Sequence, residues 1–157
     1  MSQDLEARPV PAWPGTPNMS RAGRVWFAGQ PGPEGLRAAA AEGVGLVVNL
    51  RQAQEMHSLP FDEPALVKQL GMRYENIPII PESFCCADVE RFARLLESTG
   101  GPVLVHCGSS NRVGGLWAAY AARHRSVALE AALLAGRKAG LRGDSMVEAV
   151  RRVAGAG

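Results

Sequence analysis

Residues 103–115 read VLVHCGSSNRVGG. The apolar run over residues 103–105 predicts a short buried strand, and Cys107 follows it at the start of a turn of small polar residues. Successive backbone N–H groups of such a turn can surround an anion, and the N-terminus of the helix that follows adds partial positive charge. Arg112 opens that helix with a planar guanidinium that matches two oxygens of a phosphate or sulfate. These surroundings favour the nucleophilic thiolate of Cys107, whereas an inert core cysteine is the alternative for this position.

Outward from this turn, apolar runs alternate with helical patterns along the chain. We expect strands over residues 24–28, 45–50, 72–77 and 103–105, loops over 51–60 and 78–86, helices over 34–41, 62–70, 88–98, 112–123 and 126–139, and a last helix capped by Asp144 or Ser145. Strands alternating with helices predict an α/β fold, a mostly parallel central sheet flanked by helices on both faces. The Cys107 turn then lies at the carboxyl end of a central strand, where open sheets of this kind bind ligands.

Length and composition are those of one folded domain. The chain has 157 residues, of which 46% are hydrophobic and 20% charged, so a single core is expected rather than disorder. Residues 1–23 contain Pro9, Pro11, Pro14 and Pro17 with little periodicity, which predicts an irregular lead-in. Residues 24–157 are then expected to form the single domain.

Charge and hydropathy argue against several partners. The formal charge is +2 and the basic residues are scattered, so we expect no nucleic-acid partner. No apolar run reaches the roughly 18–20 residues of a membrane span, and the acidic N-terminus is unlike a signal peptide, so we expect no membrane association. Three cysteines, with Cys85 and Cys86 adjacent, make no disulfide framework. A reducing cytoplasm is the expected location.

The turn at residues 106–112 resembles the signature of cysteine-dependent phosphatases, in which a His-Cys pair leads a phosphate-binding loop closed by an arginine. More closely, the chain resembles the beta-lactamase hydrolase-like phosphatases, a bacterial group with a fold like that of dual-specificity phosphatases. The resemblance covers residues 25–122 through three blocks: FAGQP at 27–31, VVNLR at 47–51 followed by Glu55, and PVLVHC at 102–107 followed by Arg112 and Trp117.

This resemblance implies a hydrolase of the cysteine phosphatase type, similar to protein tyrosine and dual-specificity phosphatases. Cys107 is then the nucleophile that forms a phosphocysteine, and Arg112 holds the phosphoryl oxygens. The phosphate-binding amides are those of Gly108, Ser109, Ser110, Asn111 and Arg112. His106 orients the turn and supports the thiolate, and Arg51 lies beside the site. No metal or other cofactor is implied, and His57, His106 and His124 lack the spacing of metal ligands.

Three positions depart from the pattern of most cysteine phosphatases. Only four residues separate Cys107 from Arg112, where the usual loop has five. Val113 follows Arg112, where a serine or threonine usually helps the cysteine to leave. The segment expected to carry a general acid has no clear aspartate: Glu82 is the first choice and Asp88 the second, although Asp88 also suits a helix N-cap.

Three functions therefore remain open from the sequence. The first is phosphomonoester hydrolysis through a phosphocysteine, with a phosphorylated protein or small molecule as substrate. The second is sulfur transfer through a Cys107 persulfide, since rhodanese-type sulfurtransferases also have a short loop. The third is a non-catalytic anion-binding module. The sequence defines neither the oligomeric state nor the role of Cys85 and Cys86, for which packing and a protective disulfide with Cys107 are the two interpretations.

Overall fold

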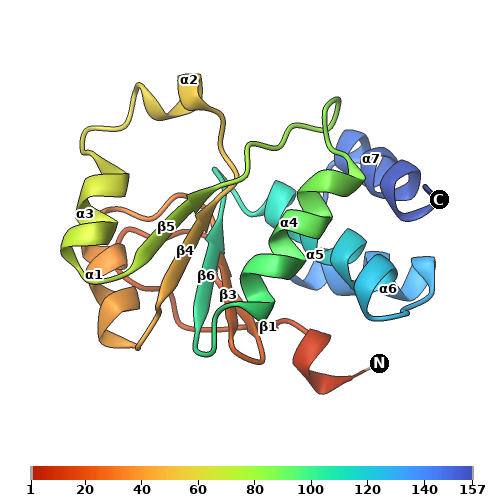
Figure 1. Ribbon diagram of the computed structural model, residues 1–157, viewed down its shortest axis with the longest axis horizontal. Helices are drawn as coiled ribbons and strands as arrows, with labels where there is room; N and C mark the ends of the chain where they lie inside the picture. The colour runs from red at the N-terminus through yellow and green to blue at the C-terminus, as the bar shows by residue number, and fades with distance from the viewer. Residues whose placement is uncertain (1, 157) are drawn as a thin grey trace.

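The computed structural model describes residues 2–156 and shows one twisted sheet between two layers of helices (Figure 1). The strands are β1 (Arg8–Pro9), β2 (Ser20–Ala22), β3 (Val25–Ala28), β4 (Leu46–Asn49), β5 (Arg73–Asn76) and β6 (Val103–His106). A 3-10 helix η1 (Gln3–Leu5) precedes them, and the α-helices are α1 (Pro33–Ala41), α2 (Ala53–Met56), α3 (Glu63–Gln69), α4 (Cys86–Glu97), α5 (Asn111–His124), α6 (Leu129–Lys138) and α7 (Asp144–Ala154).

The sheet has the strand order β1-β2-β3-β6-β4-β5. The neighbouring strands β3, β6, β4 and β5 are parallel. Strand β6 lies between β3 and β4, with Val105 beside Phe27 and Val48. All four residues of β6 are buried, as expected for a strand covered on both faces. The expected α/β fold with a mostly parallel sheet is confirmed, and the cysteine turn follows its central strand.

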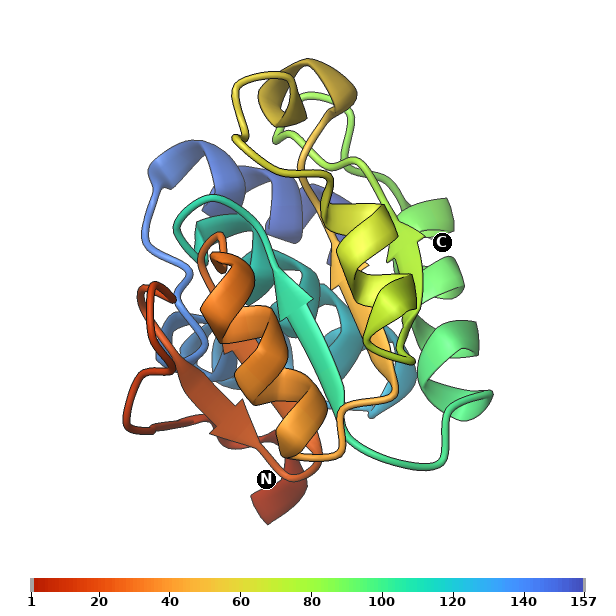
Figure 2. The same ribbon diagram turned by 90° about the vertical axis from the view of Figure 1, so that its left-hand side faces the viewer.

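Helices cover both faces of the sheet, as Figures 1 and 2 show from two directions. Leu104 of β6 packs with Leu36 of α1 and Val67 of α3 on one face. Val103 and Val105 point the other way, into a larger core that also contains Phe92 and Leu116. Side chains alternate between the two faces of a strand, so β6 contributes residues to both cores. Both cores therefore hold in place the strand that precedes the cysteine turn.

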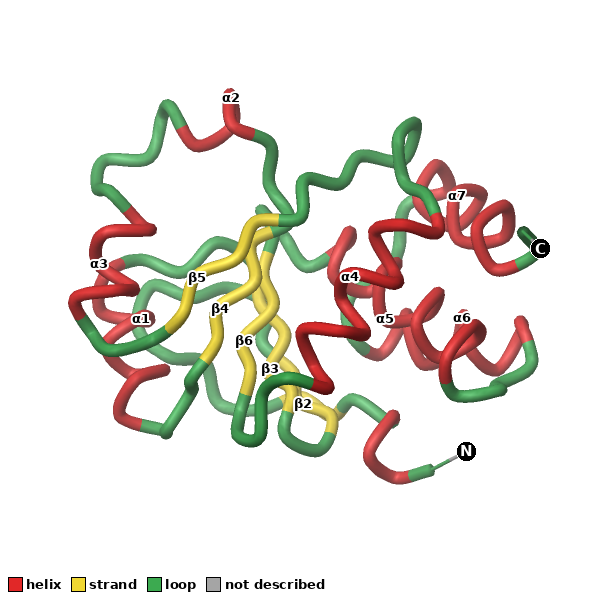
Figure 3. Tube along the Cα trace, viewed as in Figure 1, coloured by secondary structure: helices red, strands yellow, loops and turns green. Residues whose placement is uncertain are grey.

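The N-terminal segment and the connection after β4 are more regular than expected (Figure 3). We expected irregular structure over residues 1–23, but β1 and β2 extend the sheet by antiparallel pairing with β3. Two or three paired residues leave little sequence signal. The expected loop over 51–60 contains the single-turn helix α2, which a capping box between Gln52 and Glu55 closes.

Three expected helix caps are wrong. Cys85, not Asp88, is the N-cap residue of α4, and Asp88 lies three residues inside and accepts the Cys85 N–H. Ser126 adopts a left-handed backbone conformation (φ 57°) and α6 begins only at Leu129. Gly143 precedes α7, so neither Asp144 nor Ser145 caps it.

Within residues 2–156, no helix has both the length and the hydrophobicity needed to cross a membrane.

Candidate functional site

The cysteine loop, defined here as residues 107–112, joins the end of β6 to the first turn of α5. Cys107 is only 1% exposed, and the N–H of Ser110 donates a hydrogen bond to its Sγ at 3.1 Å. Ser110 reaches this position through a left-handed backbone conformation, with φ 75°. An N–H directed at sulfur is a donor that can stabilise negative charge there.

Backbone carbonyls of the cysteine loop are held by other parts of the chain. The Gly108 carbonyl accepts the Gln30 N–H at 3.0 Å. The Ser109 carbonyl accepts Asn18 Nδ2 at 3.1 Å and Arg142 Nη2 at 2.6 Å. The carbonyls of Gly108 and Ser109 therefore accept hydrogen bonds from residues outside the loop.

Four amides of the same loop are free. Within residues 2–156, the N–H groups of Gly108, Ser109, Asn111 and Arg112 have no hydrogen-bond partner. Consecutive unpaired N–H groups at the start of a helix form an anion-binding nest. The Asn111 side chain faces elsewhere: its Oδ1 accepts the N–H groups of Arg142 and Gly143 at 2.9 and 3.1 Å.

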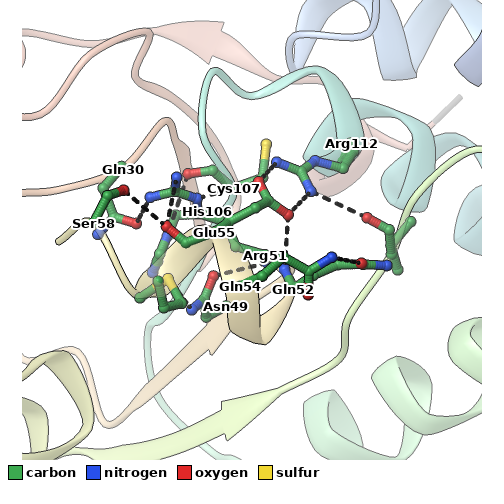
Figure 4. Close-up of polar contacts among 12 residues, drawn as sticks. Gln30, Asn49, Arg51, Gln52, Gln54, Glu55, Ser58, His106, Cys107 and Arg112 are labelled. Carbon is green, nitrogen blue, oxygen red and sulfur yellow. Dashed lines mark hydrogen bonds and ion pairs between the residues drawn. The ribbon is translucent and has the colours of Figure 1, made fainter.

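Arg112 lies in the first turn of α5 and forms a two-pronged ion pair with Glu55 of α2 (Figure 4). Its Nη1 donates to Glu55 Oε2 and its Nη2 to Glu55 Oε1, both at 2.7 Å. These bonds lower the pKa of Glu55 to about 2 and raise that of Arg112, with burial opposing both shifts. Arg112 Nη1 also donates to the Ile79 carbonyl at 3.2 Å, which ties the site to the segment after β5.

Arg51 extends this charged cluster. Its Nε lies 3.4 Å from Glu55 Oε1, and its Nη1 donates to Gln30 Oε1 at 2.8 Å. The Gln52 N–H donates to Glu55 Oε2 at 2.8 Å, so the α2 capping box fixes the carboxylate toward Arg112. Arg51 thus contacts both Gln30 and Glu55, the partner of Arg112.

His106 is fully buried between Cys107 and a carboxylate. Its Nδ1 lies 3.2 Å from the Cys107 carbonyl oxygen, and its Nε2 lies 2.6 Å from Glu63 Oε2. Gln30 Nε2 donates to the other oxygen of Glu63 at 2.6 Å. Glu63 is not predictable as a site residue from the sequence, because it follows a helix cap and precedes a proline, as exposed helix starts also do.

The loop between β5 and α4 carries both candidate acids. Glu82 is exposed in the turn at residues 81–83. Arg152 of α7 donates to the carbonyls of Pro81 and Phe84 at 3.1 and 2.7 Å, which hold this turn in place. Asp88 serves the first turn of α4. Within residues 2–156, no hydrogen bond joins Glu82 or Asp88 to Cys107 or Arg112.

The other histidines and cysteines do not form a metal site. Across residues 2–156, no group of three or more His, Cys, Asp or Glu side chains is arranged to hold a metal ion. His124 ends α5 and pairs with Glu90 at 3.0 Å, and Cys85 is exposed at the start of α4.

Curated proteins with a related sequence include a beta-lactamase hydrolase-like protein of Xylella fastidiosa (strain Temecula1 / ATCC 700964). It is 34% identical over 97 residues, which cover 60% of this chain and 22% of that protein. The chain therefore matches only about a fifth of the length of this curated relative.

Solved structures share the fold at lower identity. TpbA of P. aeruginosa superimposes with a TM-score of 0.74 at 22% identity, covering 98% of this chain and 91% of TpbA. A DUF442 protein of Shewanella putrefaciens CN-32 gives a TM-score of 0.67 at 23% identity, covering 88% of this chain and 92% of that one. At these identities the likeness concerns the fold.

The family model described as "Beta-lactamase hydrolase-like protein, phosphatase-like domain" matches residues 18–124, from Asn18 beside the cysteine loop to the last residue of α5. This range includes the loop, Arg51, Glu55, Glu63 and both candidate acids. The chain belongs to the phosphatase-like domain family of the beta-lactamase hydrolase-like proteins.

Proposed function

We propose that the chain is a cysteine-dependent phosphatase that hydrolyses phosphomonoesters through a phosphocysteine. The observation that carries this proposal is the cysteine loop itself. One of its amides donates to Cys107 Sγ, others are unpaired, and Arg112 stands at its end. This arrangement supplies a nucleophile and donors for the charge on the phosphoryl oxygens, which is most of what phosphoryl transfer requires.

In the first step, the Cys107 thiolate attacks phosphorus and the sulfur–phosphorus bond forms as the bond to the leaving oxygen breaks. Glu82, in its protonated form, gives that oxygen a proton. In the second step, water attacks phosphorus, the sulfur–phosphorus bond breaks and the thiolate leaves. The Glu82 carboxylate takes the proton of the water, so phosphate is released and the enzyme returns to its starting state.

The second step lacks one common aid. Val113 is buried and has no hydroxyl to assist the departing thiolate. Of the two loop serines, Ser110 Oγ is engaged with the Asn18 carbonyl at 3.0 Å, whereas Ser109 is exposed. We therefore expect phosphocysteine breakdown to limit turnover, with a burst of leaving group equal to the enzyme concentration.

The proposed substrate is a phosphorylated protein or small molecule. A cysteine-to-serine variant of TpbA has been solved in complex with phosphotyrosine. An aryl phosphate is therefore the first substrate to test here.

Sulfur transfer is the second candidate because of one observation, the four-residue spacing between Cys107 and Arg112. In that reaction the Cys107 thiolate attacks the outer sulfur of thiosulfate, forms a persulfide and releases sulfite. A thiophile such as cyanide then takes the outer sulfur and restores the thiolate. No proton donor is required, so Glu82 has no part in it.

One paired assay tests the proposal. Phosphate release from p-nitrophenyl phosphate is measured beside thiosulfate-to-cyanide transfer, on wild type, Cys107→Ser and Cys85→Ser. Cys85 is exposed and serves as the matched control for loss of a thiol. We expect phosphate release by wild type and Cys85→Ser, and none by Cys107→Ser. Phosphate release that survives in Cys107→Ser overturns the nucleophile, and sulfur transfer without phosphate release selects the second candidate.

A further inference from the structure

Behind the cysteine loop lies a buried histidine–carboxylate pair. The side chains of His106 and Glu63 are both 0% exposed, and Nε2 of the imidazole lies 2.6 Å from Oε2 of the carboxylate. The other ring nitrogen, Nδ1, faces the carbonyl oxygen of Cys107 at 3.2 Å. A carbonyl oxygen only accepts hydrogen bonds, so Nδ1 carries a proton. A second proton must lie between Nε2 and Oε2, and which of these two atoms carries it sets the charge on each partner, although not their sum.

Gln30 donates a hydrogen bond to the second oxygen of the Glu63 carboxylate. Arg51 only donates hydrogen bonds, so the oxygen of the Gln30 amide faces its guanidinium, at 2.8 Å. The amide nitrogen of Gln30 therefore faces Glu63 Oε1, at 2.6 Å. Oε1 of Glu63 therefore accepts this hydrogen bond and carries no proton, so Oε2 is the Glu63 oxygen that shares a proton with His106.

The charges around the pair favour a proton on His106, which leaves an imidazolium beside an ionised Glu63 carboxylate. An imidazole is ordinarily more basic than a carboxylic acid by about two pH units. The positively charged Arg51 is hydrogen-bonded to Gln30, which is hydrogen-bonded in turn to Glu63, so this cation favours an ionised Glu63. A thiolate at Cys107 would place negative charge on the residue whose carbonyl His106 contacts, which favours a positively charged His106. Asp62, the N-cap residue of α3, and Tyr74 on β5 also face this region; the pKa of Tyr74 is raised, chiefly by burial and partly by the charge of Glu63.

We infer that Glu63 holds His106 as an imidazolium, so that a fixed positive charge is buried beside the nucleophile Cys107. Glu63 is a positioning residue: it acts on Cys107 only through His106. This inference rests on the proposed function for its catalytic meaning, whereas the protonation state of His106 does not depend on it.

The pair is also joined to the other side of the site. Gln30 donates to Glu63, Arg51 donates to both Gln30 and Glu55, and Arg112 donates to Glu55. One continuous chain of side chains therefore links the histidine beside the nucleophile to the arginine that receives the phosphate.

The test reads the His106 nitrogens directly. The chain has three histidines, so a ¹⁵N-histidine-labelled sample gives few signals, and His106→Gln identifies the one that matters. We expect both ring nitrogens of His106 to carry protons at neutral pH in wild type. In Glu63→Gln the amide N–H can donate to Nε2, so this nitrogen should lose its proton. An unprotonated Nε2 in wild type overturns the inference, and this measurement needs no variant of Glu63 to fold.

A second readout concerns the thiolate. Iodoacetamide alkylation of Cys107 at roughly pH 6, followed by mass spectrometry of the Cys107 peptide, should be about tenfold slower in Glu63→Gln, a change of about 1.4 kcal/mol. In a His106→Gln background the same substitution should cause no further loss. The matched control is Asp62→Asn, which removes the neighbouring carboxylate that accepts the Ala65 N–H but has no bond to His106. Equal rates in Glu63→Gln and Asp62→Asn overturn the positioning role.

These outcomes are separate from failure of the proposed function. Phosphate release by Cys107→Ser overturns the phosphocysteine while leaving the nitrogen spectrum of His106 unaffected. A neutral His106 in an enzyme that depends on Cys107 overturns only the inference about Glu63.

Discussion

Arg112 and Glu55 face each other edge to edge, joined by two parallel hydrogen bonds of 2.7 Å. The guanidinium plane is therefore set by a carboxylate from a different element, α2, before any ligand arrives. A planar fork held in this way loses less side-chain entropy when it binds an anion than a freely rotating one. Glu55 neutralises one positive charge, and Arg51 leaves the cluster with a net positive charge.

The planarity of Arg112 leads to the first prediction. Arg112→Lys keeps the charge but cannot make two parallel bonds to Glu55 or to phosphate. We expect kcat for p-nitrophenyl phosphate to fall by about 10²–10³, as when a transition-state donor is removed elsewhere. The control is Arg94→Lys on the exposed side of α4, which should retain activity. Near-normal turnover of Arg112→Lys, with an unchanged circular dichroism spectrum, would show that Arg112 does not hold the phosphoryl group.

The low pKa of Glu55 predicts a dependence of stability on pH. The Arg112 hydrogen bonds lower that pKa from 4.5 to about 2, so folding favours the ionised form. The resulting stability is complete above the unfolded value and is lost as the pH falls from 4.5 toward 2. Because the carboxylate is partly exposed, we expect Glu55→Gln to cost only about 1 kcal/mol at neutral pH.

Urea unfolding at a series of pH values measures this effect. The difference in unfolding free energy between wild type and Glu55→Gln should shrink as the pH falls through this range. Glu34→Gln is the control, since Glu34 is exposed and pairs with its helix neighbour Arg37. A difference that stays constant down to about pH 2 would contradict the assignment of this acid sensitivity to Glu55.

Glu82 is expected to act as the general acid. Protonation of a leaving oxygen contributes about 10²–10⁴ in rate, and poor leaving groups need it most. Glu82→Gln should therefore lower turnover of alkyl phosphates strongly and that of nitrophenyl phosphate much less. Asp88→Asn weakens the cap of α4 and should show no dependence on the leaving group. If Asp88→Asn shows that dependence instead, the acid is Asp88, and equal losses on both substrates would leave the enzyme without a dedicated acid.

The contact between α5 and α6 is predicted to tolerate no side chain at Gly114. A Cβ there would meet the backbone nitrogen of Leu141 and the backbone oxygen of Gly136, neither of which moves easily. We expect Gly114→Ala to cost about 1–3 kcal/mol of unfolding free energy. Thermal unfolding checks this, with Gly100→Ala as the control, since a Cβ at Gly100 meets nothing within 4 Å. A transition as high as that of the control would mean that the two helices can separate at little cost.

The parts of the molecule that were predictable from the sequence are local. The strand before Cys107, the turn and the helix from Arg112 follow one another along the chain, so composition and periodicity define them. The Glu63–His106 pair joins residues 43 apart, and nothing near Glu63 distinguishes a buried carboxylate from an exposed helix start. Helix α2 has four residues and no apolar face, so only its capping box marks it.

Ser109 offers one carbonyl to two distant segments, since Asn18 reaches it from before β2 and Arg142 from the connection between α6 and α7. Gln30 holds the preceding carbonyl from a third segment. The cysteine loop is therefore not a portable motif. A grafted peptide spanning residues 103–115 would carry the nucleophile and the arginine into another scaffold without the three side-chain and backbone donors that hold its carbonyls. Design of a minimal enzyme from this fold has to transplant the surrounding chain together with the loop.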